Sequence, residues 1–205
     1  MGNDSCSPLK MKVTKENNRL MIIANILTII LTILLVLIRV SETRLDAKSG
    51  FVMRVAIEAG YILTLLYLVN ILQFFDEKTA FRTPFELYIG FEVIKFILSM
   101  LKFSDLSSSQ TYIYVMGIGL LNFCISLYLI ISLFKIKHPV LAQPYRLFGI
   151  SLILILLTKF GLPLIFMNLH ILPPSAYFGV IDCIPLLAIF YIIRKTGTLL
   201  DTIPK

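Results

Sequence analysis

The chain has 205 residues, of which 58% are hydrophobic and only 15% are charged, and its mean hydropathy is +0.88. Soluble domains are nearer about 45–50% apolar and about 25% charged, so this composition excludes an ordinary soluble domain and predicts an all-α membrane protein. The formal net charge is +7. The basic residues lie at the ends of apolar runs rather than in a stripe that could bind phosphates, so we expect no nucleic-acid partner.

The first half of the sequence holds three apolar runs that are long enough to cross a bilayer, which takes about 20 residues. The first has no charged residue between Arg19 and Arg39, and the second follows Gly50. The third begins at Pro84, and proline is well tolerated in the first turn of a helix. These runs predict membrane spans over 20–39, 51–75 and 84–103.

Three further runs follow in the second half. The fourth holds no charge between Asp105 and Lys135. A polar string with two prolines over 138–144 separates it from the fifth, and Pro173 with Pro174 enforces a tight turn before the sixth. The predicted spans are 111–134, 146–168 and 175–193.

The predicted architecture is therefore a polytopic bundle of six transmembrane helices with short loops. Lys and Arg are concentrated on the side that carries both chain ends, so the positive-inside rule predicts cytoplasmic termini. We divide the chain into a cytoplasmic N-terminal tail (1–19), a transmembrane domain (20–194) and a cytoplasmic C-terminal tail (195–205). The first apolar run has no cleavage signal after it, and the short loops favour a bacterial inner membrane.

Charged residues interrupt these apolar spans, although each costs roughly 2.5–3.5 kcal/mol in a bilayer unless it is paired or hydrated. In the last hairpin, Lys159 and Asp182 lie at similar distances from the tight turn. Because a short turn makes the two helices antiparallel neighbours, both residues are expected roughly 12 Å below the outer surface at 1.5 Å per residue, where they can form an ion pair.

The second hairpin repeats this arrangement with Glu58, Glu92 and Lys95. Glu92 and Lys95 share a helix face at i and i+3, and Arg54 and Glu58 do so at i and i+4. We expect Glu58 to bridge Arg54 and Lys95. The two hairpins together predict one outward-facing polar pocket, with Arg54 and Tyr177 at its rim and five charged residues inside it: Glu58, Glu92, Lys95, Lys159 and Asp182. Asn25, Asn70 and Asn122 also lie inside spans and predict hydrogen bonds between helices.

Three functions fit this pattern. The first is a small transporter or substrate-binding membrane subunit whose pocket holds a small polar or zwitterionic solute or a coupling ion. The second is a membrane scaffold whose ion pairs are structural and whose partner is another membrane protein. The third is an intramembrane enzyme. The chain has only two histidines, His138 and His170, and it lacks a serine-nucleophile motif and a glycine-rich phosphate loop. We therefore expect no catalytic residues, no metal and no cofactor, with the lipid bilayer as the general partner.

Overall fold

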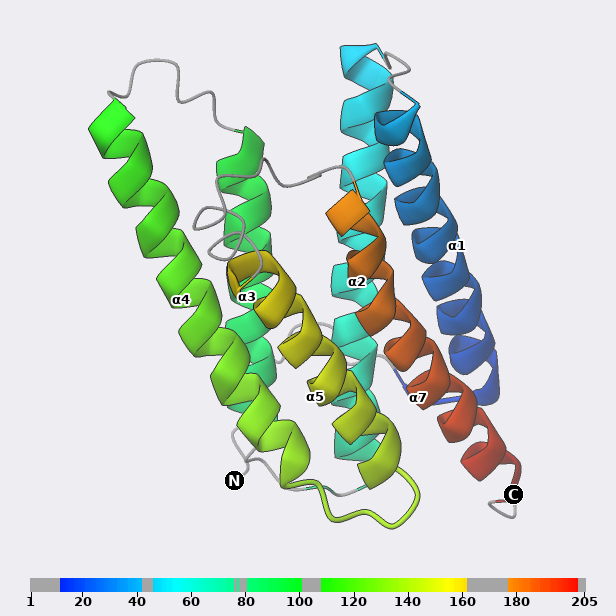
Figure 1. Cartoon of the computed structure of the whole chain (residues 1–205). Helices are drawn as coiled ribbons and strands as arrows, with labels where there is room; N and C mark the ends of the chain where they lie inside the picture. The colour runs from blue at the N-terminus through cyan, green and yellow to red at the C-terminus, as the bar shows by residue number, and fades with distance from the viewer. Residues whose placement is uncertain are drawn as a thin grey trace, which may run out of the picture.

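The computed structural model describes residues 12–41, 46–75, 77, 81–100, 108–161 and 177–202. These residues form helices and no strand, which confirms the predicted all-α class. The helices are α1 (Lys15–Val40), α2 (Ala47–Phe74), α3 (Arg82–Met100), α4 (Ser108–Phe134), α5 (Ala142–Leu156) and α7 (Cys183–Thr202) (Figure 1). Two short helices flank the last connection: a π-helical turn, η2 (Leu157–Gly161), and a 3₁₀ helix, η3 (Tyr177–Asp182).

The helices form a closed ring. Each packs against its neighbours in the order α1, α2, α3, α4, α5 and α7, and α7 returns to α1. A further contact between α2 and α7 crosses the ring. The start of α1 and the end of α7 meet at one end of the bundle (Figure 1), where Lys15 and Asp201 form an ion pair of 2.6 Å.

Side-chain caps define where the first two helices begin. The Thr14 hydroxyl accepts a hydrogen bond from the backbone N–H of Asn17, which satisfies one of the free donors of the first turn of α1. Asp46 caps α2 in the same way, through the backbone N–H of Ser49 at 3.2 Å. Hydrogen bonds from Ser49 also hold the pKa of Asp46 below its ordinary value, because they stabilise the carboxylate.

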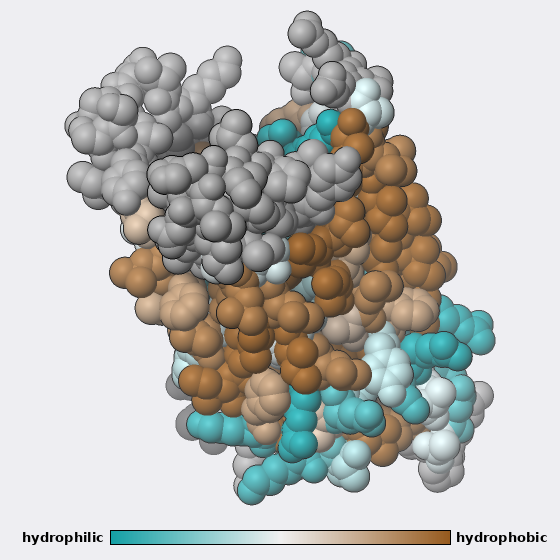
Figure 2. All heavy atoms as spheres, in the orientation of Figure 1, coloured by the Kyte–Doolittle hydropathy of each residue, from teal (hydrophilic) through white to brown (hydrophobic). Residues whose placement is uncertain are grey.

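Four segments are long and apolar enough to cross a membrane, which indicates a membrane helical bundle. They are Lys15–Val40, Lys48–Phe74, Met116–Phe134 and Val180–Thr202. Large apolar side chains cover their outer faces; on α1, Leu20, Ile23 and Leu27 are each more than half exposed. Figure 2 shows hydrophobic residues over the middle of the visible face and hydrophilic residues gathered at its lower end. An apolar band of this kind is the surface that lipid covers.

The remaining two helices, α3 and α5, do not have this character. α3 is 19 residues long and carries four charged side chains, and α5 has 15 residues before its π-helical turn. Both complete the ring, α3 between α2 and α4 and α5 between α4 and α7. α3 and α5 therefore belong to the same ring of helices as the four apolar segments.

Several helix ends differ from the sequence-based expectation. α7 does not end near residue 193 but continues to Thr202, because Thr196 and Leu200 are buried along its inner face. Most of the predicted tail 195–205 is thus helical, and α1 likewise begins at Lys15, inside the predicted tail 1–19. α5 begins at Ala142 rather than 146, since the Pro144 ring is accommodated in its first turn. α4 begins at Ser108 rather than at 111, so the last part of the polar break predicted over 104–110 is helical, whereas the predicted turn at 168–174 lies outside the described residues.

The apolar core occupies the half of the bundle nearer the paired ends of α1 and α7. It is built around large, fully buried side chains, among them Tyr67, Phe85, Tyr145 and Phe148. The Tyr145 hydroxyl donates to the Leu68 carbonyl at 2.9 Å, so this buried polar group is satisfied. The five charged residues predicted to line a pocket lie in the other half of the bundle.

Candidate functional site

A cavity of about 350 Å³ lies between the helices in that second half. Every helix of the ring, with η2 and η3, contributes residues to its wall. The five charged residues that the sequence pointed to all line it: Glu58, Glu92, Lys95, Lys159 and Asp182. The structure therefore brings side chains from both hairpins into one site.

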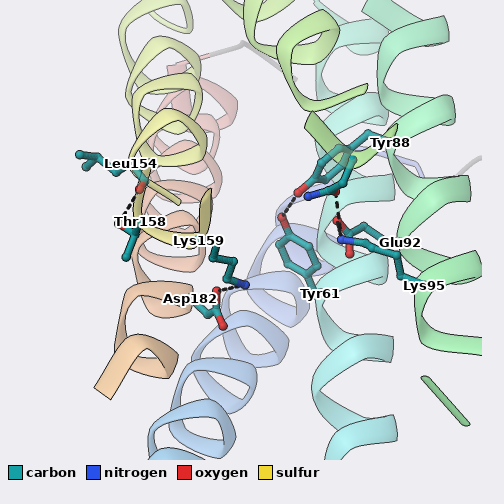
Figure 3. A network of polar contacts seen from close by, with 9 residues as sticks. Tyr61, Tyr88, Glu92, Lys95, Leu154, Thr158, Lys159 and Asp182 are labelled. Carbon is teal, nitrogen blue, oxygen red and sulfur yellow. Dashed lines mark hydrogen bonds and ion pairs between the residues drawn. The ribbon is translucent and has the colours of Figure 1, made fainter. Parts of the chain in front are cut away.

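Lys159 and Asp182 form the ion pair expected from the last hairpin, with 2.7 Å between Nζ and Oδ1 (Figure 3). Lys159 lies in the π-helical turn that follows α5, and Asp182 is the last residue of η3. Their side chains are 47% and 40% exposed, so the pair is accessible from the cavity. Both residues thus sit where regular α-helical geometry is interrupted, and single π-helical turns are frequent at functional sites.

Glu92 and Lys95 form a second ion pair on α3, again at 2.7 Å. Glu92 is only 8% exposed, and a buried carboxylate requires a partner of this kind. The Lys95 ammonium also donates to the Asn122 side-chain oxygen on α4 at 3.2 Å and lies 5.5 Å from the centre of the Phe91 ring. The predicted common face of Glu92 and Lys95 is confirmed, and Asn122 links it to the neighbouring helix.

Glu58 differs from the other four charged residues. Among the described residues it has no ion pair and no hydrogen bond, although it interacts electrostatically with both Lys–acid pairs. The predicted bridge from Arg54 through Glu58 to Lys95 is therefore wrong. The Lys95 ammonium is already occupied by Glu92 and Asn122, and Arg54 is exposed and contributes nothing to the cavity wall. The side chain of Tyr177, the other predicted rim residue, lies outside the described part.

Tyrosines complete the wall between the two ion pairs. The Tyr61 and Tyr88 hydroxyls lie 3.2 Å apart, and Figure 3 shows Tyr61 between the Lys159–Asp182 pair and the Glu92–Lys95 pair. Sequence reasoning missed both rings. The signal was available, because Tyr61 follows Glu58 by three positions and Tyr88 precedes Glu92 by four, which places each pair on one helix face.

The predicted hydrogen bonds of the membrane asparagines are confirmed for two of the three. Asn25 donates to the Leu186 carbonyl of α7 at 3.2 Å, and Asn122 accepts from Lys95. Asn70 instead donates to the Leu66 carbonyl of its own helix at 2.9 Å. The half-buried Asn70 amide is thus satisfied within its own helix, so the residue type alone does not specify the partner.

In the part of the chain that the structure describes, no group of three or more metal-ligating side chains is found. Comparison with protein families, with curated proteins and with solved structures found no match for the chain. The class that the fold and the site define is a membrane helical bundle with an internal cavity lined by charged residues. Its function must be argued from the chemistry of that cavity.

Proposed function

We propose that the chain is a small membrane transporter or substrate-binding membrane subunit whose cavity holds a small polar solute. One observation supports this most directly: the cavity gathers five charged side chains in an otherwise apolar bundle. Each such charge costs roughly 2.5–3.5 kcal/mol in a bilayer, and intramembrane charges mark solute and ion pathways. Only the Lys159–Asp182 pair joins two elements of the chain, whereas Glu92 and Lys95 lie on the same helix, so joining helices does not account for all five charges.

The proposal includes six membrane spans with both ends in the cytoplasm. α3 and α5 with η2 would cross the membrane as members of the ring, with Glu92, Lys95 and Lys159 directed to the cavity. Lys15 and Arg19 start α1, Arg194 and Lys195 lie near the end of α7, and Lys135 and Lys137 follow α4. This accumulation of basic residues at one end favours its cytoplasmic location. The cavity, in the opposite half, would open to the outside.

Solvent access from outside tests the proposal. In a background without Cys6, Cys124 and Cys183, single Glu58→Cys and Asp182→Cys variants are exposed to a membrane-impermeant thiol reagent added outside intact cells or oriented vesicles. Leu65→Cys is the matched control, because Leu65 lies on the same helix as Glu58 and is fully buried. We expect labelling at positions 58 and 182 and none at 65. Folded protein that reacts at neither cavity position would refute an outward-facing polar site.

A second function, a membrane scaffold with structural ion pairs, is favoured by the close contact of both pairs at 2.7 Å. The charge swap Lys159→Asp with Asp182→Lys separates the two functions. In a scaffold the swap recovers both the thermal stability and the association with a membrane partner that either single substitution removes. In a solute site it recovers stability alone, because the field at the cavity wall is reversed.

A further inference from the structure

Among the described residues, the charges that line the cavity do not balance. Three acidic residues, Glu58, Glu92 and Asp182, face two lysines, Lys95 and Lys159. Each lysine lies 2.7 Å from one acidic partner, and Glu58 is left over. Glu58 interacts with all four of these groups and is paired with none among the described residues. The excess charge of the ionised site is therefore a single negative one, located at Glu58.

The lysines are poorly placed to receive an anion. Lys95 is held by Glu92 and by the Asn122 oxygen, and Lys159 is held by Asp182. The ammonium groups keep free N–H donors, but a carboxylate at 2.7 Å already neutralises the charge of each, so an incoming carboxylate or phosphate would meet little net attraction. A ligand that carries a positive charge is attracted to Glu58, whose two carboxylate oxygens have no ion pair and no hydrogen bond among the described residues.

The rest of the wall suits a cation with apolar substituents. Tyr61, Tyr88 and Phe96 line the cavity, and aromatic faces attract ammonium groups, more strongly when the group is desolvated. Leu152 and Ile155 add an aliphatic surface against which methyl or methylene groups can pack. The cavity volume of about 350 Å³ is near the lower end of small-molecule sites and fits a compact solute.

We infer that the cavity binds a small organic ammonium ion and that Glu58 is its counter-charge. This inference rests on the proposed function and specifies its substrate class. The ammonium head lies beside Glu58 among the aromatic rings, while the two ion pairs stay closed and define the polar boundary of the site.

Three probes of nearly the same shape and different charge test the inference. Choline carries a permanent positive charge, its carbon isostere dimethylbutanol is neutral, and glycine betaine is zwitterionic. Binding of radiolabelled choline to the purified full-length protein in lipid nanodiscs is measured by equilibrium dialysis, with the other two compounds as competitors. We expect saturable choline binding that the neutral isostere does not displace and that betaine displaces at least tenfold less effectively than unlabelled choline.

Variants of the counter-charge complete the test. We expect Glu58→Gln to weaken choline binding by about tenfold or more, which corresponds to about 1.4 kcal/mol, and Glu58→Asp to retain part of it. Glu86→Gln is the matched control, since Glu86 is an exposed residue of α3 paired with Arg82 and lies outside the cavity wall. The melting temperature of each variant verifies that it is folded.

The results distinguish the inference from the proposed function. The cation assignment is overturned if dimethylbutanol or betaine competes as well as choline, or if folded Glu58→Gln binds choline like the wild type. It is also overturned if no choline binds while positions 58 and 182 are labelled from outside, and in that case the solvent-accessible polar site stands. Absence of both choline binding and labelling overturns the inference and the proposed function together.

Discussion

The contact between α1 and α2 at Gly60 predicts that the same substitution has opposite effects at two glycines. A β-carbon added at Gly60 would lie 2.1 Å from the Thr28 hydroxyl oxygen and 3.3 Å from the Thr28 β-carbon. Thr28 cannot easily turn away, because its hydroxyl donates to the Ala24 carbonyl at 2.8 Å and β-branched side chains have few rotamers in a helix. At Gly90 on α3, an added β-carbon meets no atom within 4 Å.

The magnitudes follow from two opposing effects. Alanine is favoured over glycine inside a helix by about 0.8–1.0 kcal/mol, and this gain applies at both positions. Overpacking costs typically about 1–3 kcal/mol, and it applies only at Gly60. We therefore expect Gly90→Ala to stabilise the protein by about 1 kcal/mol and Gly60→Ala to destabilise it by up to about 2 kcal/mol. For a chain of this size, 1 kcal/mol corresponds to about 2–4 °C in melting temperature.

Thermal unfolding in detergent measures both variants against the wild type. The double substitution Thr28→Ala with Gly60→Ala is the decisive control, because it removes the oxygen that causes the clash. We expect it to recover most of the stability lost in Gly60→Ala. If Gly60→Ala melts at or above the temperature of Gly90→Ala, the close approach of α1 and α2 is refuted.

Three further predictions concern polar groups outside the cavity. The Asn25 amide donates to the Leu186 carbonyl, but its buried side-chain oxygen has no partner in the described structure, so Asn25→Leu is expected to destabilise by no more than about 1 kcal/mol. Asn18→Leu, which removes the acceptor of the Tyr67 hydroxyl, should destabilise by about 1–3 kcal/mol in chemical or thermal unfolding. Glu77, between α2 and α3, accepts hydrogen bonds from the backbone N–H groups of Lys137 and His138, between α4 and α5. Glu77→Ala should therefore lower the melting temperature more than Glu77→Gln, which keeps an acceptor oxygen. Equal effects of the two substitutions would contradict this role. The folded-state pKa of Asp46 is lowered, so the contribution of its carboxylate to stability is complete above the unfolded-state pKa and is lost as the pH falls through the folded-state pKa. Asparagine can cap the helix but does not titrate. The melting temperature of Asp46→Asn should therefore depend less on pH than that of the wild type below about pH 4.

The helical membrane class and the two ion pairs could be predicted because they depend on local geometry. Glu92 and Lys95 are three positions apart on one helix, and the helical period alone places them on the same face. Lys159 and Asp182 belong to consecutive helices, and their similar distances from the tight turn match their depths. Neither inference requires knowledge of how the remaining helices pack.

The state of Glu58 could not be predicted in this way. Its distance from Lys95 depends on how α2 and α3 are rotated about their own axes, and Lys95 has alternative partners on α3 and α4. The same holds for the Tyr61–Tyr88 contact and for the extension of α7 to Thr202, which is stabilised by burial against the bundle.

Hydrophobic length and charge spacing in the sequence were enough to indicate a membrane helical bundle and to mark the five charged residues that line its cavity. The tertiary structure alone decided which acid has no ion pair among the described residues, which aromatic residues line the same cavity and which glycine has no room for a side chain. The physical reason is that helix period and short turns act within one or two segments. Helix rotation and close approach are instead set by the simultaneous packing of the whole ring, in which each side chain competes for a limited number of partners.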